Sequence, residues 1–177
     1  MTAVEQWLAV HPREVVTFVV QDEVTPADTE AVFRTAGLLP YVHTQPEARP
    51  WPTLGQMINS GRRVVVLMEN HGGGTAYPWL LQGFDWVQDT PYENPRRADL
   101  SCRLERGSAD NPILLVNHWL GGFRTLVTDA RMVNARGVLL PELERCRIER
   151  GQLPNFVAVN FYDQGDLFSV IDTLNGF

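Results

Sequence analysis

The sequence predicts an α/β protein built on a parallel sheet, and three observations lead to this class. Short apolar runs rich in Val, Ile and Leu recur along the chain, segments with helical periodicity separate them, and each run ends in polar residues. Continuous apolar strands are typical of a parallel sheet covered on both faces, and polar residues at successive carboxyl ends are typical of a (β/α) barrel. The predicted fold is a partial barrel of the triosephosphate isomerase type, with about five parallel strands and flanking helices.

Five runs are predicted as strands because apolar and β-branched residues dominate them. In chain order they cover residues 14–20, 62–68, 84–88, 112–116 and 156–159. The polar residues that follow these runs are Gln21, Asp22 and Glu23, then Glu69, Asn70 and His71, then Asp89, Thr90 and Tyr92, then Asn117 and His118, and finally Asn160, Asp163 and Asp166. We expect these side chains to lie at one rim of the sheet.

Helices are predicted between the strands from periodicity and from capping residues. They cover residues 4–10, 26–36, 54–59, 125–135, 139–150 and 167–174. The second helix is the best marked, because Thr25 suits the N-cap, Pro26 the first turn and Gly37 the position after the end. Asp163 and Asp166 are expected to cap the last helix, whose N-terminal end favours acids.

Length and composition indicate one globular domain, because the chain has 177 residues, of which 44% are hydrophobic and 20% charged. We therefore expect a single, partial barrel domain over residues 1–177. A complete barrel takes about 250 residues, so the missing β/α units are most economically placed before Met1. No apolar run approaches the roughly 20 residues of a membrane helix, and no transmembrane segment is expected.

The charged residues exclude several functions. All 15 basic residues are arginine and lysine is absent, which excludes a Schiff-base lysine, a phosphate-loop lysine and a lysine general base. The net charge is −6 and the arginines are scattered along the chain. A nucleic acid partner is therefore not expected.

The two cysteines leave two interpretations open. Cys102 and Cys146 have neither the spacing of a metal site nor that of a CxxC redox motif, so no metal site is expected. They could be two separate buried thiols, or a disulfide that closes a long loop and suits an exported protein. The compartment stays open at this point.

Six segments support a family resemblance by their order along the chain. They are residues 11–24, 62–74, 83–92, 101–107, 111–120 and 154–176, the last of which contains Asn-Phe-Tyr-Asp followed by Gly-Asp-Leu. Together they resemble the later part of the catalytic X-type domain of the phosphatidylinositol-specific phospholipase C-like phosphodiesterases. The resemblance implies a phosphoric diester hydrolase that uses one histidine as general base and another as general acid, assisted by arginine or calcium.

The resemblance also places both catalytic histidines on the first β/α units, which this chain is expected to lack. Neither His71 nor His118 is expected to take their roles, because the family motif is absent around both. The chain by itself is therefore expected to be inactive.

Several residues are carried over as a candidate substrate pocket. Gln21 falls where calcium-dependent members place a carboxylate ligand, and a glutamine there argues against calcium although Asp22 is adjacent. Glu69 stands where relatives often offer a basic contact to the inositol phosphate, and its alternative role is a rim glutamate paired with an arginine. Asp89 resembles the aspartate that receives inositol hydroxyls, with Tyr92 as a ring-stacking neighbour.

Three later residues complete the candidate set. Asn117 and His118 are consecutive after an apolar strand, so only one of them can point inward, and a hydrogen-bonded structural role is the alternative for both. Asn160 falls at or next to an aspartate that orients the base histidine in some relatives. Its carbonyl oxygen could support such a ring without adding negative charge.

Three functional hypotheses follow. The leading one is the C-terminal portion of a phospholipase C-like phosphodiesterase that recognises a phospholipid or inositol phosphate headgroup, in a full-length protein that could be secreted. The second is a non-catalytic barrel that binds inositol phosphate or a sugar. The third is a fold remnant with an exposed, unstable sheet edge.

Overall fold

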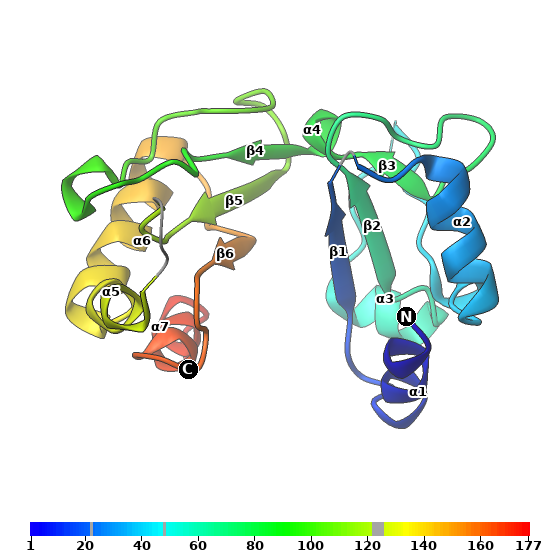
Figure 1. The fold of residues 1–177 in the computed structure, drawn as a ribbon, viewed down its shortest axis with the longest axis horizontal. Helices are drawn as coiled ribbons and strands as arrows, with labels where there is room; N and C mark the ends of the chain where they lie inside the picture. Colours follow the sequence, from blue (N-terminus) through cyan, green and yellow to red (C-terminus); the bar gives the residue numbers. More distant parts are fainter. Residues whose placement is uncertain (22, 48, 122–125) are drawn as a thin grey trace. The chain divides into compact units, whose positions relative to one another are not determined.

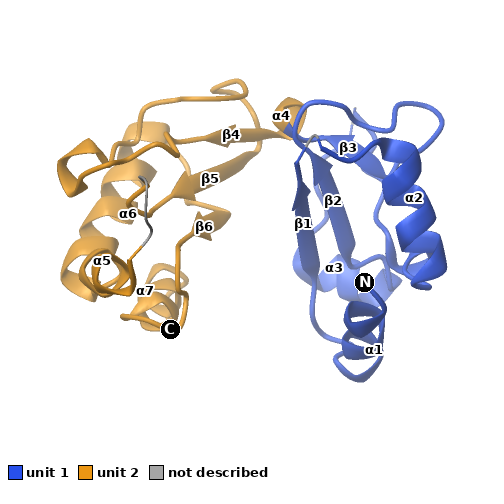
Figure 2. Cartoon of the chain, viewed as in Figure 1, with its two compact units in different colours: residues 1–83 blue, residues 84–177 orange. Residues whose placement is uncertain are grey.

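The computed structural model describes residues 1–21, 23–47, 49–121 and 126–177 (Figure 1). These residues form two compact units, Met1–Gly83 and Phe84–Phe177 (Figure 2). Each unit contains its own three-stranded parallel sheet. Asp22 and Thr125, which were predicted after the first strand and at the start of a helix, lie outside the described residues.

The sheet of unit 1 has the order β1-β2-β3, with β1 Val16–Val20, β2 Val64–Met68 and β3 Leu80–Gln82. Every residue of β2 is buried, as expected for a central strand whose two faces are covered. On the edge strand β1, by contrast, Val19 is 54% exposed. All three strands run in the same direction, so their carboxyl ends meet at one edge of the sheet.

The second and third helices of unit 1 begin at the predicted residues Pro26 and Leu54, whereas the first begins two residues before the predicted residue 4 and a 3-10 turn that was not predicted follows the second. The helical elements of this unit are α1 Thr2–Val10, α2 Pro26–Thr35, the 3-10 turn η1 Leu39–Tyr41 and α3 Leu54–Ser60. Thr25 caps α2 by accepting a hydrogen bond from the backbone N of Asp28 at 3.1 Å, and Gly61 ends α3 with a φ of 72°. The core of this unit is formed by Leu8, Phe33, Ala36, Leu38, Val42, Val64, Val66, Met68, Trp79 and Leu80.

The sheet of unit 2 has the order β4-β5-β6, with β4 Val87–Asp89, β5 Ile113–Asn117 and β6 Phe156–Ala158. Its other elements are α4 Gly83–Trp86, which begins at the last residue of unit 1, η2 Arg97–Asp99, α5 Val127–Val133, α6 Arg136–Arg150 and α7 Leu167–Leu174. Helices α6 and α7 cover the sheet through a core formed by Cys102, Leu114, Val116, Leu139, Leu143, Cys146 and Val170.

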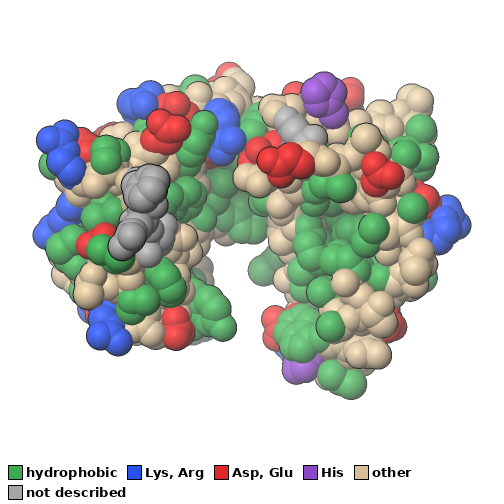
Figure 3. Space-filling model, viewed as in Figure 1, with side chains coloured by type: hydrophobic (Ala, Val, Ile, Leu, Met, Phe, Trp, Pro, Cys, Tyr) green, Lys and Arg blue, Asp and Glu red, His purple; other side chains and the backbone are tan. Residues whose placement is uncertain are grey.

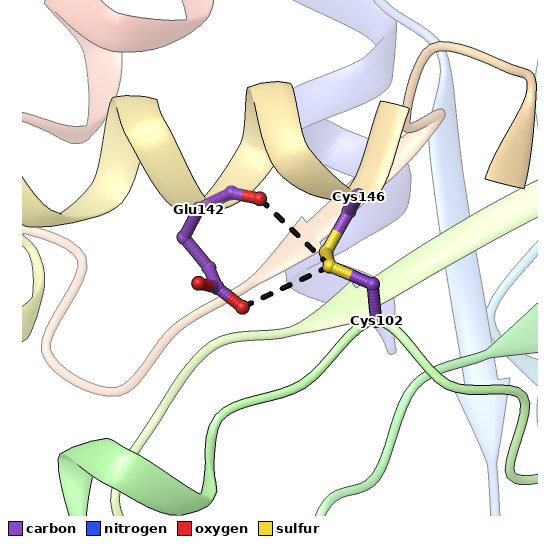
Figure 4. Close-up of side chains that lie close together, drawn as sticks. All are labelled: Cys102, Glu142 and Cys146. Atoms are coloured by element: carbon purple, nitrogen blue, oxygen red, sulfur yellow. Dashed lines mark hydrogen bonds between the residues drawn. A yellow bond between two sulfur atoms is a disulfide. The ribbon is translucent and has the colours of Figure 1, made fainter. Parts of the chain in front are cut away.

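A disulfide joins Cys102 to Cys146, with an S–S distance of 2.01 Å (Figure 4). Both cysteines are buried, and Cys146 belongs to α6 while Cys102 belongs to the connection between β4 and β5. Of the two interpretations that the sequence left open, the bridged one is therefore correct. No helix in the described part of the chain is long and apolar enough to cross a membrane.

The structure is α/β, but the predicted partial barrel of about five parallel strands is wrong. The described residues contain six strands in two separate sheets. Two local features explain the error. β3 is too short, at three residues, to stand out as an apolar run, and residues 84–86, predicted as strand, belong to the helical turn α4. That turn separates β3 from β4, and the two ladders do not join among the described residues. The assignment of residues 1–177 to a single domain stays a prediction.

Candidate functional site

The carboxyl ends of β4 and β5 bring together a buried polar group centred on Asp89. Asp89 is the last residue of β4 and is 1% exposed. Its Oδ1 accepts a hydrogen bond from the backbone N of Arg106 at 2.9 Å. Its Oδ2 accepts from Nε and Nη2 of Arg106 at 3.0 and 2.6 Å and from Nδ2 of Asn117 at 3.2 Å. These four donors provide the compensation that a buried carboxylate requires.

The segment that carries Arg106 lies along the end of β4. The backbone N of Asp89 donates to the carbonyl of Arg106 at 3.1 Å, and the backbone N of Glu105 donates to the carbonyl of Asp89 at 2.9 Å. The next residue, Gly107, has a φ of 80°, and a Cβ there would lie 1.9 Å from the carbonyl oxygen of Val87. Only glycine fits this close approach, so Gly107 keeps Arg106 against the strand.

The guanidinium of Arg106 lies over two aromatic rings. Its Cζ is 4.3 Å from the ring centroid of Phe84 and 4.5 Å from that of Tyr92. Both contacts fall within the range of cation–π attraction. The Arg106 side chain is 31% exposed and Tyr92 is 40% exposed, so this edge of the buried group reaches the surface of unit 2.

Asn117 joins the ends of β4 and β5. Its backbone N donates to Oγ1 of Thr90 at 2.9 Å, and its Nδ2 donates to the Thr90 carbonyl at 2.6 Å as well as to Asp89. We call Asp89, Thr90, Arg106 and Asn117 the Asp89 network. It has the chemistry of a rigid polar wall, because each of its side chains is hydrogen-bonded within the unit.

His118 lies in the core of unit 2. It is 0% exposed, its backbone N donates to the Ala158 carbonyl at 2.8 Å, and its Nε2 lies 2.9 Å from the Val133 carbonyl. A carbonyl can only accept, so Nε2 carries the hydrogen in this contact. Burial lowers the pKa of His118 below its usual value, which keeps the ring neutral. His118 thus ties the end of β5 to α5.

Asn160, two residues after β6, is half-buried and lies beside residues of the β5–α5 region, with no space between them that would hold a water molecule. These neighbouring residues are Trp119, Leu120, Leu126, Asp129, Ala130 and Val133. The backbone carbonyl of Asn160 accepts from Nδ2 of Asn134 at 3.0 Å. Sequence reasoning did not single out Asn134, which lies at the end of α5 and outside every strand end.

Of the two acids predicted to cap α7, Asp166 occupies the N-cap position, but its side chain makes no capping hydrogen bond to that helix. Its Oδ2 instead accepts from the backbone N of Arg136, in the first turn of α6, at 2.8 Å. Asp163 accepts from the Gln164 side chain at 3.0 Å. The segment before α7 therefore contacts the start of α6. Helical periodicity in the sequence cannot predict a contact of this kind.

In unit 1, the carboxyl edge of the sheet carries Gln21 and Glu69. Gln21 is exposed after β1, and half-buried Glu69 follows β2, its backbone N donating to the Val20 carbonyl at 2.9 Å. Gln82, at the end of β3, fixes the turn after Glu69, because its side chain accepts from the backbone N of Gly72 at 2.7 Å and donates to the Asn70 carbonyl at 2.6 Å. Acidic and histidine side chains gather at this end of unit 1 (Figure 3).

The predicted residues therefore fall into three groups. Asp89, Tyr92 and Asn117 meet around Arg106. Gln21 and Glu69 share the carboxyl edge of the sheet in unit 1. His118 and Asn160 follow β5 and β6, the first buried and the second half-buried beside Trp119 and Asp129. Their part in substrate binding stays a prediction. The sequence did not indicate Arg106, Asn134 or Gln82 as candidate site residues. Of the three, only Arg106 lies in a segment that carried the family resemblance, residues 101–107.

The histidines do not form a catalytic pair within either unit. His118 is the single histidine of unit 2 and is buried. In unit 1, His11 follows α1 before β1, and His43 lies beside the start of β2, since its backbone N donates to the Val64 carbonyl. Only His71 follows a strand end in unit 1, where it is exposed.

One group in the described residues brings three potential metal ligands within reach of one another, namely Cys102, Glu142 and Cys146 (Figure 4). Zinc and similar ions bind cysteine as the thiolate. The disulfide uses both sulfurs, so the oxidised protein offers this group no thiolate ligand.

Comparison with known proteins gives consistent matches over almost the whole chain. The family described as PI-PLC X 1 matches residues 1–175. A "PI-PLC X domain-containing protein 1" of the fungus Arthroderma benhamiae is 27% identical over 193 residues, which cover 99% of this chain and 63% of that protein. A PI-PLC X domain-containing protein of Arabidopsis thaliana is 28% identical over 187 residues, which cover 98% of this chain and 43% of that protein.

A third relative, an "Uncharacterized secreted protein" of Arthroderma benhamiae, is 25% identical over 201 residues, covering 97% of this chain and 45% of that protein. The chain thus spans between 43% and 63% of the length of these relatives. No solved structure matches the chain significantly.

Proposed function

The chain belongs to the PI-PLC X family, and we propose that it forms part of a phosphoric diester hydrolase of the phospholipase C-like type. Membership confirms the resemblance seen in the sequence. The substrate class proposed here is a phospholipid or phosphoinositide-type diester, and the part of the substrate that this chain recognises is the headgroup.

The observation that carries this proposal is the Asp89 network. A buried carboxylate fixes the guanidinium of Arg106 through two side-chain bonds, and the guanidinium lies against Tyr92 at the surface of unit 2. Arginine is the side chain that proteins commonly use to recognise phosphate, here held by Asp89 through its Nε and Nη2, and an exposed tyrosine ring can pack on a polyol ring. The network has the composition of a headgroup-binding wall.

The same proposal assigns no catalytic histidine to this chain. A phosphodiesterase of this type needs a general base and a general acid on opposite sides of the reacting phosphate. The single histidine of unit 2 is buried and neutral, and unit 1 has one histidine after a strand end. We therefore propose that histidines outside these 177 residues complete the site and that the isolated chain is inactive.

The test compares the longest native product that contains these residues with residues 1–177 alone. Each is assayed for release of water-soluble phosphorylated headgroup from phosphatidylinositol and from lysophosphatidylcholine in mixed micelles. Turnover by the longer product and none by the isolated chain is the expected result. Turnover by the isolated chain that is abolished by His71→Ala or His118→Ala would contradict the proposal.

A second candidate function is headgroup binding without turnover. It is favoured by the same two facts taken together, a complete Asp89 network and no histidine pair within either unit. Calorimetry with inositol phosphate distinguishes the two functions. Binding that is lost in Asp89→Ala, with no hydrolysis even by the longest native product, would favour the binding module.

We also propose that the protein works in an oxidising compartment. The Cys102–Cys146 bridge is buried in the core of unit 2, and structural disulfides persist outside the reducing cytosol. A relative whose name describes it as secreted supports the same assignment. Mass spectrometry of the natively produced protein, without reductant, should find the two cysteines linked.

A further inference from the structure

Asn134 makes an unusual set of contacts with one loop. It is 0% exposed at the end of α5, and its Nδ2 donates to the carbonyls of Asn160 at 3.0 Å and of Gln164 at 3.1 Å. The carbonyl of Phe161 lies 3.5 Å from the same nitrogen. Carbonyl oxygens can only accept, so the three contacts fix which end of the Asn134 amide faces the loop.

The loop, residues 160–166, also closes on the backbone of Asn134. The backbone N of Asp166 donates to the Asn134 carbonyl at 2.9 Å. Gly165 has a φ of 88°, and a Cβ there would lie 2.7 Å from Cβ of Asn134, so the two residues touch without room for a side chain. Asn134 therefore contacts the loop near its beginning and near its end.

One residue of this loop has a backbone conformation that needs support. Phe161 has a φ of 51°, the only positive φ found at a non-glycine residue among those described. This left-handed conformation is disfavoured for side chains such as phenylalanine, and it persists where surrounding contacts hold it. The φ angle of Phe161 lies between the carbonyl groups of Asn160 and Phe161. Both carbonyl oxygens face the Asn134 amide.

We propose that Asn134 is a positioning residue for loop 160–166, which carries the candidate site residue Asn160. It holds this loop in a strained conformation and thereby fixes Asn160 beside Trp119 and Asp129. Without the amide donor, Phe161 relaxes to a negative φ and Asn160 loses this position. The role of Asn134 in shaping the loop stands on these contacts, and its importance for the substrate rests on the proposed function.

The test replaces the donor without changing the size of the side chain. Asn134→Asp presents oxygen atoms to the three carbonyls, while Gln45→Glu makes the same amide-to-acid change at a buried residue of unit 1 whose Nε2 also donates to carbonyls, those of Pro46 and Arg49. If Asn134→Asp does not fold, Asn134→Ser removes the amide without adding charge. Amide hydrogen exchange of residues 160–166 is the measurement.

Exchange at the hydrogen-bonded amides of Gln164 and Asp166 should become about tenfold faster or more in the Asn134 variant, the effect expected for losing roughly one hydrogen bond. Exchange in β4, β5 and α6 should stay close to that of the wild type, and Gln45→Glu should leave the loop unchanged. Unchanged exchange in the loop, or an equal increase throughout unit 2, would overturn the proposal.

A second variant tests the strain directly. Phe161→Gly removes the penalty for a positive φ, so Asn134→Asp should accelerate loop exchange less in the Phe161→Gly background than in the wild type. A residue that only fills space would give equal effects in both backgrounds, and that result would also overturn the proposal.

The catalytic consequence is measured separately, on the longest native product. Asn134→Asp should lower kcat/KM for phosphodiester hydrolysis about tenfold, again the cost of roughly one hydrogen bond, while Gln45→Glu leaves it unchanged. A wild-type product that hydrolyses no phosphodiester refutes the proposed function, and the exchange measurements then decide on Asn134 by themselves.

Discussion

Replacing Cys102 and Cys146 together by alanine should destabilise unit 2 strongly and leave unit 1 unchanged. The bridge spans a sequence separation of 44 residues, for which the chain-entropy relation gives about 4 kcal/mol at 25 °C. Both ends belong to the core of unit 2, so alanine also removes buried sulfur and leaves small voids beside Leu139 and Leu143. The free energy of unfolding of a domain is typically about 5–15 kcal/mol, so this loss is a large fraction of it.

The assay must separate the two units. Hydrogen exchange followed by mass spectrometry across a urea series does so, because peptides from β2 report on unit 1 and peptides from β5 report on unit 2. The free energy of opening should fall by about 4 kcal/mol for β5 and stay within about 0.5 kcal/mol for β2. A loss below about 1 kcal/mol at β5, or an equal loss at β2, would refute the view that the bridge fastens the β4–β5 connection to α6.

Three further predictions concern unit 2. Gly107→Ala should destabilise this unit by at least the roughly 1–2 kcal/mol that an alanine in the left-handed conformation costs, because the new Cβ also meets the carbonyl oxygen of Val87. A urea midpoint for β5 peptides equal to that of the wild type would contradict this. Asp89→Asn should lower the free energy of unfolding of unit 2 by about 2–3 kcal/mol in the same measurement. The loss should be smaller than for a fully buried ion pair, because the Arg106 side chain is 31% exposed. An unchanged free energy would show that the carboxylate is dispensable. Burial lowers the pKa of His118 in the folded state, so the unfolded chain binds the proton more readily. The free energy of unfolding should therefore fall as the pH drops below about 6.5, by at most about 1.4 kcal/mol per pH unit. His118→Gln should flatten this dependence between pH 7.5 and pH 5.5, and an unchanged slope would count against a neutral, buried ring.

The elements that the sequence predicted well are those whose signals are local. The apolar runs predicted at 14–20, 62–68 and 112–116 coincide within two residues with β1, β2 and β5, because β-branched residues pack well between covering layers. Thr25 and Gly61 sit at helix ends for reasons that lie within a few residues of each. The path between β3 and β4 was missed because α4 is one turn of helix with a strand-like composition.

The candidate site shows the same limit. Asp89 and Asn117 were predicted because each follows a strand, and the structure joins them at 3.2 Å. Arg106 lies 17 residues after Asp89 in an irregular segment, so only the folded chain shows that its guanidinium binds that carboxylate. Asn134 lies 26 residues before Asn160 and has no motif around it. Partners that meet across loops leave no periodic signal in a single sequence.

The most direct test of the proposed headgroup wall is a rate comparison on the longest native product that contains this chain. Arg106→Gln removes the guanidinium that Asp89 fixes, while Arg103→Gln removes an exposed arginine of the same segment that pairs with Glu105. Release of phosphorylated headgroup from phosphatidylinositol should show kcat/KM reduced about a hundredfold in Arg106→Gln, the cost of losing a charged hydrogen-bonding contact to phosphate, and unchanged in Arg103→Gln. Equal rates for wild type and both variants would contradict the account.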